Sequence, residues 1–148
     1  MALKPDRVEH LTDLSFFMDE TATRGQIVTH SSDGSGASMD DANAKVIKAT
    51  GVSDNPAGLL LNDVVDIDLT RQHINFAKDE VQKGGKVLLL RRGTVVTDNI
   101  DGATPSAGDK AYFDTQARLT TTASSAQIGR FLSAKDADGY AKVEINIV

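Results

Sequence analysis

The sequence contains no cysteine and no tryptophan, and aromatic residues make up only 5% of its 148 positions. The missing cysteines exclude disulfides, thiolate nucleophiles and cysteine-ligated zinc, and they leave the redox compartment undecided. The few aromatic rings count against a carbohydrate-binding module, because such modules stack sugars on them. The longest apolar runs, GLLL and VLLL, are far too short to cross a bilayer, and the polar start MALKPDRVEH predicts no signal peptide. We therefore expect no membrane partner.

Positive charge is also in short supply. Lysine and arginine total 16 against 21 acidic residues, which gives a net charge of −5, and only Arg91 and Arg92 stand together. A nucleic-acid-binding protein normally carries a basic face, so we expect no nucleic-acid partner. Glycine, threonine, aspartate and serine are plentiful instead, which is typical of a mainly β protein with many turns. The length suits a single compact domain.

The first 24 residues differ from the rest because charged and apolar residues do not alternate in them. We predict an N-terminal arm at residues 1–24 and a β domain at residues 25–148. The arm packs on its own domain, lies across a partner whose grooves it fills, or stays loose, and the sequence leaves these alternatives open. Its apolar cluster consists of Leu11, Leu14, Phe16, Phe17 and Met18.

Short β-branched and alternating runs follow from Gly25 onward, which predicts many strands. The string GQIVT at Gly25 returns as GTVVT at Gly93, each before a polar glycine-bearing loop, and a β-unit used twice would close a small barrel or sandwich. Gly84-Gly85 between two β-capable runs predicts a hairpin. One short helix is expected, with INFAKDEVQK (74–83) a better candidate than NAKVIKAT (43–50).

The C-terminal string AKDADG matches part of a calcium-binding loop. The first and twelfth ligand positions hold Ala134 and Ile145, so the residues that carry most of the charge are missing. We interpret Asp138-Gly139 as a tight turn before a last strand whose alternate residues are buried. Histidines at ligand spacing, a nucleophile elbow and a phosphate loop are also missing, so we expect no catalytic residue, metal or cofactor. The predicted buried residues are Ala141, Val143, Ile145 and Ile147.

One predicted strand is apolar on both faces. One face belongs to the core, and the other is a subunit interface or a second buried face of a two-layer domain; the sequence favours neither. The strand residues are Val87, Leu88, Leu89 and Leu90.

Most of the chain resembles the head decoration proteins of tailed bacteriophages, also called capsid cement proteins. The resemblance rests on a G-x-V-V strand opener, an AGD-x-AY turn and strand, an L-T step and the terminal hairpin IGRFLSAKDADG-x-A-x-V-x-I. The string ATGVSDNPAGLLLNDVVDIDL adds the glycines of an earlier G…aGll pattern. The resemblance covers roughly residues 25–148 and is most specific over residues 78–148.

This resemblance implies a non-enzymatic protein with a small β-barrel-like or β-tulip-like domain and an extended N-terminal arm. Such proteins usually form trimers on the outer surface of an icosahedral capsid, where they clamp neighbouring major capsid proteins. We therefore expect the major capsid protein and self, as a homotrimer, as partners, and the virion as location after a stay in the host cytoplasm. Capsid contact is assigned to the arm's apolar cluster, and removing residues 1–20 is expected to leave a folded oligomer. The alternative is another β-rich virion component, such as a tail-tube or head–tail connector subunit.

Overall fold

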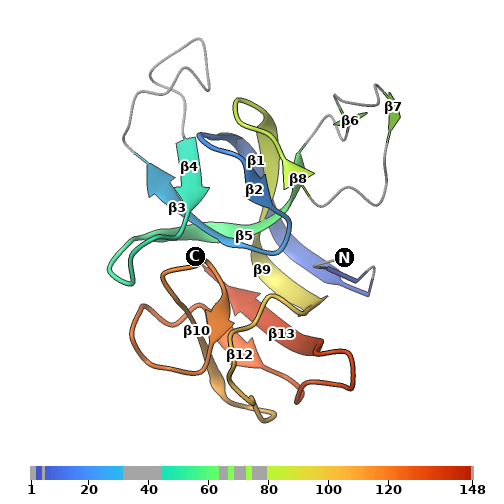
Figure 1. The fold of residues 1–148 in the computed structure, drawn as a ribbon, viewed down its shortest axis with the longest axis vertical. Helices are drawn as coiled ribbons and strands as arrows, with labels where there is room; N and C mark the ends of the chain where they lie inside the picture. Colours follow the sequence, from blue (N-terminus) through green and yellow to red (C-terminus); the bar gives the residue numbers. More distant parts are fainter. Residues whose placement is uncertain are drawn as a thin grey trace.

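A computed structural model describes residues 3–4, 6–31, 45–63, 67–68, 73–74 and 80–147. All regular structure in these residues is β, so the mainly β prediction is confirmed and the described part contains no helix (Figure 1). Of the two helix candidates, residues 45–48 form a strand, whereas residues 75–79 of the second lie outside the described residues and its residues 74 and 80–81 belong to strands. The strands are β1 (Val8–Met18), β2 (Ala22–Thr23), β3 (Ile27–Ser31), β4 (Lys45–Lys48), β5 (Pro56–Asp63), β6 (Ile67–Asp68), β7 (His73–Ile74), β8 (Glu80–Val81), β9 (Lys86–Thr97), β10 (Lys110–Phe113), β11 (Leu119–Thr120), β12 (Gly129–Phe131) and β13 (Ala141–Asn146).

The long strand β9 runs through both parts of the molecule (Figure 1). β5 pairs with its first half, from Val87 to Leu90, and β13 pairs with its second half, from Arg92 to Thr97. β1 pairs across both stretches, so it must occupy the opposite edge of β9. β9 is therefore the strand to which the other long strands are attached.

The hydrogen-bonded neighbours run from β1 through β4, β3, β5 and β9 and return to β1, which makes a circuit of five strands. The whole nine-stranded sheet is not a closed barrel, because it continues from β9 through β13, β12 and β10 to β11. Figure 1 shows the circuit in the upper part of the view and the strands from β10 onward in the lower part.

Two hydrophobic cores use opposite faces of the same strands. Side chains of a strand point alternately to its two faces, so Leu60 and Leu89 enter the smaller core while Leu59 and Leu90 enter the larger one. The run VLLL is apolar on both faces because it separates the two cores. All five strands of the circuit contribute to the smaller core, which consists of Phe16, Met18, Ala22, Val28, Val46, Ala57, Leu60, Val81, Val87 and Leu89.

The last two strands form the predicted hairpin. β12 and β13 pair antiparallel, and along β13 buried and exposed residues alternate without a break. Ala141, Val143, Ile145 and Ile147 all lie in the larger core, as predicted. Burying each of the larger side chains stabilises the fold by about 1.5–3 kcal/mol, so this strand closes that core.

β1, β9 and β13 meet at Gly93, which faces Glu9 on one side and Ile145 on the other. A Cβ at this position would overlap the carbonyl oxygen of Val8 and touch the side chain of Leu90. Its φ of 154° is also rarely adopted by residues with a side chain. Glycine is therefore required at this position of β9, which has β1 on one side and β13 on the other.

Candidate functional site

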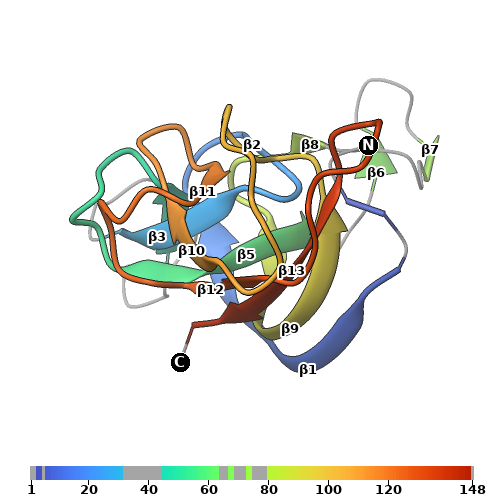
Figure 2. The ribbon, with the colours of Figure 1, turned by 90° about the horizontal axis from the view of Figure 1, so that it is seen from below.

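The outer half of β1, residues 8–15, carries three of the four large apolar side chains that are exposed among the described residues. It is hydrogen-bonded to β9 along one edge, whereas β1 meets β4 only at Phe17 and Met18. Within the described part of the chain, the second edge of residues 8–15 carries no strand. Figure 2 shows β1 beside β9 at the rim of the molecule. Such an edge is a ready template for contact with another protein.

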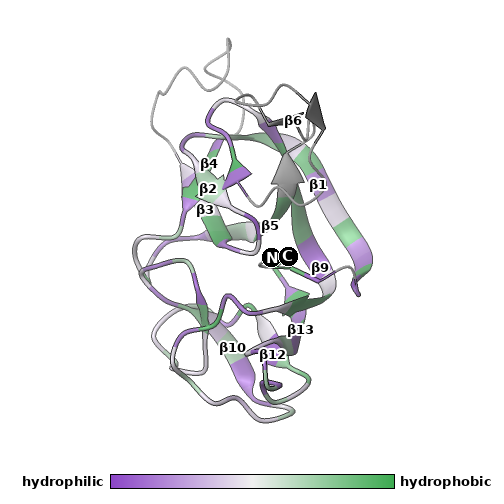
Figure 3. Ribbon diagram, turned by 45° about the vertical axis from the view of Figure 1, so that its right-hand side comes forward, coloured by the Kyte–Doolittle hydropathy of each residue, from purple (hydrophilic) through white to green (hydrophobic). Residues whose placement is uncertain are grey.

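Three aliphatic side chains project from this outer half into solvent. The exposed fractions are 48% for Val8, 43% for Leu11 and 50% for Leu14. The strand has register shifts on both sides of Leu11 and again between Asp13 and Phe16, and each bulge disturbs the alternation of buried and exposed residues. Figure 3 shows hydrophobic and hydrophilic bands alternating along β1 on the outside of the molecule. Val8 was not among the predicted contact residues.

The inner end of β1 is buried in the protein itself. Phe16 is 8% exposed and Met18 is 0% exposed, and both belong to the smaller core, while Phe17 is half-buried. The ring of Phe16 lies 5.5 Å from the ring of His30. Of the five residues predicted to contact a capsid, the structure thus leaves Leu11 and Leu14 exposed and uses Phe16 and Met18 for its own packing.

A polar contact fixes the outer half of β1 against β9. The Asp13 carboxylate accepts hydrogen bonds from the hydroxyl and the backbone amide of Ser15, and Arg91 lies 3.7 Å away. The hydroxyl of Ser15, together with its amide and the Arg91 charge, holds the pKa of Asp13 below its ordinary value. The lowered pKa keeps the carboxylate charged further into the acid range, so that it continues to face Arg91 on β9.

The predicted interface residues on β9 lie inside the domain. Val87, Leu89 and Leu90 are fully buried, and the partly buried Leu88 packs against the larger core. The sequence left open whether the second face of this strand is a subunit interface or is buried within the domain. In the structure these side chains are packed within the domain. They leave little surface for a second subunit.

The C-terminal turn is organised by Asp136. Its carboxylate accepts hydrogen bonds from the amides of Asp138, at 2.9 Å, and Tyr140, at 3.0 Å. Gly139 adopts a φ of 86°, which agrees with the predicted tight turn. Lys4 approaches the same carboxylate at 3.7 Å, and its ammonium lies over the Tyr140 ring. The amide of Tyr140 is the largest cause that lowers the pKa of Asp136.

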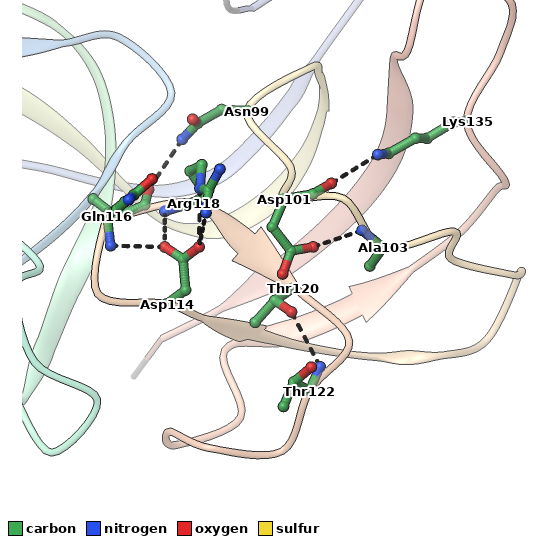
Figure 4. Close-up of polar contacts among 10 residues, drawn as sticks. Asn99, Asp101, Ala103, Asp114, Gln116, Arg118, Thr120, Thr122 and Lys135 are labelled. Atoms are coloured by element: carbon green, nitrogen blue, oxygen red, sulfur yellow. Dashed lines mark hydrogen bonds and ion pairs between the residues drawn. The ribbon is translucent and has the colours of Figure 1, made fainter.

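A group of polar side chains ties the loops around β11 together (Figure 4). The Asp114 carboxylate accepts hydrogen bonds from the backbone amides of Gln116 and Arg118 and from the guanidinium of Arg118. The Asn99 amide donates to the carbonyls of Gly25 and Ala117 and so joins two distant loops. Most of these contacts satisfy backbone groups, and Asp114 and Arg118 also form an ion pair of 2.9 Å.

The described residues contain no group of three or more histidine, cysteine or acidic side chains arranged to hold a metal ion. Among the same residues no helix is long and apolar enough to span a membrane.

Among solved structures, the fold is similar to that of the N base of the head fiber gp8.5 of bacteriophage phi29. The two chains share 13% sequence identity at a TM-score of 0.52, and the match covers 95% of this chain and 94% of the other. No curated protein matches the sequence. The family model for the structural cement protein (E217 gp24/Pam3 gp6) matches residues 9–146, and the chain therefore belongs to this family of phage structural cement proteins.

Proposed function

We propose that this protein binds the outer surface of an icosahedral phage head and stabilises the expanded head by joining neighbouring major capsid proteins. Membership of the structural cement family supports a head-associated structural role without catalysis. The structural neighbour is described as part of a phage head fiber, which agrees with a place on the head. These relations favour a head protein over the alternative of a tail-tube or connector subunit.

The exposed outer half of β1 is the observation that carries the proposal. Val8, Leu11 and Leu14 expose apolar surface on a strand with one unpaired edge in the described structure, which a soluble monomer would normally protect. We assign capsid contact to these residues and leave Phe16 and Met18 to the core. Phe17, which is half-buried, would lie at the margin of the contact.

Stabilisation follows from mass action. Contacts that exist only in the assembled, expanded shell lower its free energy relative to dissociated or unexpanded states. A shell offers many equivalent positions, and if each bound protein touches two neighbouring capsid subunits, modest contacts become strong through effective concentration. A rigid sheet that carries the contact strand loses little conformational entropy on binding.

We further propose that the protein assembles as a homotrimer, accumulates in the host cytoplasm and joins the virion on the outside of the shell. Val87, Leu89 and Leu90 are buried and Leu88 is partly buried, so the trimer would use other surfaces. Sedimentation of the purified protein would give a trimer mass, and a monomer at all concentrations would contradict this part.

A binding assay with empty heads tests the proposal. The purified protein is mixed with expanded and unexpanded heads, and the pellet after sedimentation is analysed. We expect saturable binding to expanded heads and a higher temperature of head disruption in its presence. Equal binding to both kinds of head, or none to either, would contradict the proposed role.

A further inference from the structure

Three shallow hollows adjoin one another on the solvent face of β9, β13 and β12. The first, of about 330 Å³, shares Glu144 with the second, of about 290 Å³. The second shares Gln127 and Asn146 with the third, of about 370 Å³. Because they share lining residues, they lie next to one another on a strip of surface, here called the groove, that runs from His10 on β1 to Pro56.

The groove is basic although the chain carries a net charge of −5. Its lining includes one acidic residue, Glu144, and five basic ones: two histidines that become cationic on protonation and three arginines, of which Arg91 also faces Asp13 at 3.7 Å. Strand pairing brings them together: Arg130 faces Glu144, and Arg92 faces Asn146, although the partners are far apart in the sequence. The five are His10, His30, Arg91, Arg92 and Arg130.

The two arginines at the centre of the groove are available to a ligand. Arg92 and Arg130 are both exposed, and neither forms an ion pair within the described residues. Arg130 donates one hydrogen bond, of 3.2 Å, to the carbonyl of Gly108, which leaves its other donors unused among these residues. A guanidinium presents a fork of donors that suits a carboxylate.

The floor and walls suit a polypeptide. Gly93 and Gly129 belong to the lining and offer only backbone atoms there. The lining also includes three side-chain amides, each able to donate and accept hydrogen bonds with a peptide backbone. These belong to Asn55, Gln127 and Asn146.

We infer that this groove binds an extended acidic polypeptide segment, with its carboxylates on Arg92 and Arg130 and its backbone on the amides. Apart from two histidines, no lining residue in the described structure is aromatic, which disfavours nucleic acids and sugars that stack on rings. The inference goes beyond the proposed function and does not depend on it, because it names a second contact whose chemistry differs from that of the apolar residues on β1.

Fluorescence anisotropy with a labelled oligo-glutamate peptide tests the inference. We expect saturable binding at low salt and a loss of about tenfold or more in affinity for the double variant Arg92→Gln, Arg130→Gln. The matched control, Lys83→Gln with Lys86→Gln, removes the same charge at two exposed residues, one in the turn before β9 and one at the first residue of β9. It should change the affinity less than about twofold. Thermal melts of both variants check that the fold persists.

Several results would overturn the inference. Equal losses in both double variants would show attraction by overall charge, and unchanged binding in the Arg92 and Arg130 variant would place the peptide elsewhere. A single-stranded oligonucleotide that binds more tightly than oligo-glutamate, and depends on the same arginines, would replace the polypeptide by a nucleic acid. Loss of self-association in the Arg92 and Arg130 variant, without an effect on peptide binding, would make a second copy of the chain the occupant.

Discussion

The two parts of β1 use similar residues for opposite purposes. The outer half, residues 8–15, keeps Leu11 and Leu14 in solvent, whereas the inner end of the same strand buries Phe16 and Met18. Both parts pair with β9, so hydrogen bonding does not distinguish them. The difference comes from the other edge, because only Phe17 and Met18 pair with β4 and so join the circuit of five strands.

This difference separates stability from recognition within one strand. Residues enclosed by the circuit exchange water for close packing and so contribute to the free energy of folding. Residues beyond it contribute little to that free energy, and their apolar surface is free for a partner. Substitutions at the two ends should therefore affect different measurements.

The largest loss of stability is expected for Met18→Ala. The side chain is fully buried in the smaller core, and its removal leaves a cavity that costs about 2–5 kcal/mol. Denaturant unfolding of this variant and of Leu14→Ala measures the contrast, since the exposed Leu14 should cost less than about 0.5 kcal/mol. Equal destabilisation by both would erase the distinction between the two ends of β1.

A smaller loss is expected for Gly93→Ala. The added methyl must push the carbonyl of Val8 away, and the positive φ adds strain, which together cost about 1–3 kcal/mol. Gly102→Ala is the control, because a Cβ there meets nothing within 4 Å. Hydrogen exchange of the outer half of β1 should accelerate in Gly93→Ala alone. An unchanged exchange rate would mean that the pairing of β1 with β9 at Gly93 does not hold this half of the strand in place.

The smallest effect concerns Asp136, which joins the N-terminal segment to the last hairpin through Lys4. Its pKa is lowered from 3.8, so the carboxylate stabilises the fold above that value, and the contribution is lost as the pH falls toward the folded-state pKa. Asp136→Asn should lower the melting temperature at pH 7 and make its decline below pH 4 shallower. Part of the decline should remain in the Asp136→Asn variant, because the pKa of Asp13 is also lowered in the folded protein. Identical pH profiles for the two proteins would contradict the assigned role.

The sequence predicted regular strands well and irregular ones poorly. The alternation over Ala141, Val143 and Ile145 identified a strand with one buried face, because a period of two has no other simple explanation. Asp138 was expected to shape the turn before it, but the organising carboxylate belongs to Asp136. Periodicity finds the strand, while the hydrogen bonds of a turn depend on backbone geometry that it does not describe.

The strand β1 was not predicted because it contains bulges. Register shifts disturb the alternation, so residues 8–18 read as an arm without regular structure. The expectation that residues 1–20 can be removed from a folded protein is reversed, because removal would take away β1, Leu3, Phe16 and Met18. Only long-range pairing with β9 shows that this segment belongs to the domain.

Other long-range predictions failed for the same reason. GQIVT runs from a turn into β3, which pairs with β4 and β5, whereas GTVVT is the end of β9 and pairs with β1 and β13. The repeated string therefore does not build a repeated unit. Gly84-Gly85 does not join a hairpin of β8 and β9 either. β8 pairs with β2, and the two glycines exchange backbone hydrogen bonds with Met18.

The central claim is that the exposed half of β1 attaches the protein to expanded heads. The most direct test is cosedimentation of the double variant Leu11→Ser, Leu14→Ser with empty expanded heads, beside Leu132→Ser as a control at another exposed leucine, 38% exposed. We expect both variants to melt close to the unmodified protein, and we expect only the double variant to lose binding, by about tenfold or more. Binding by the double variant that matches the unmodified protein would contradict the claim.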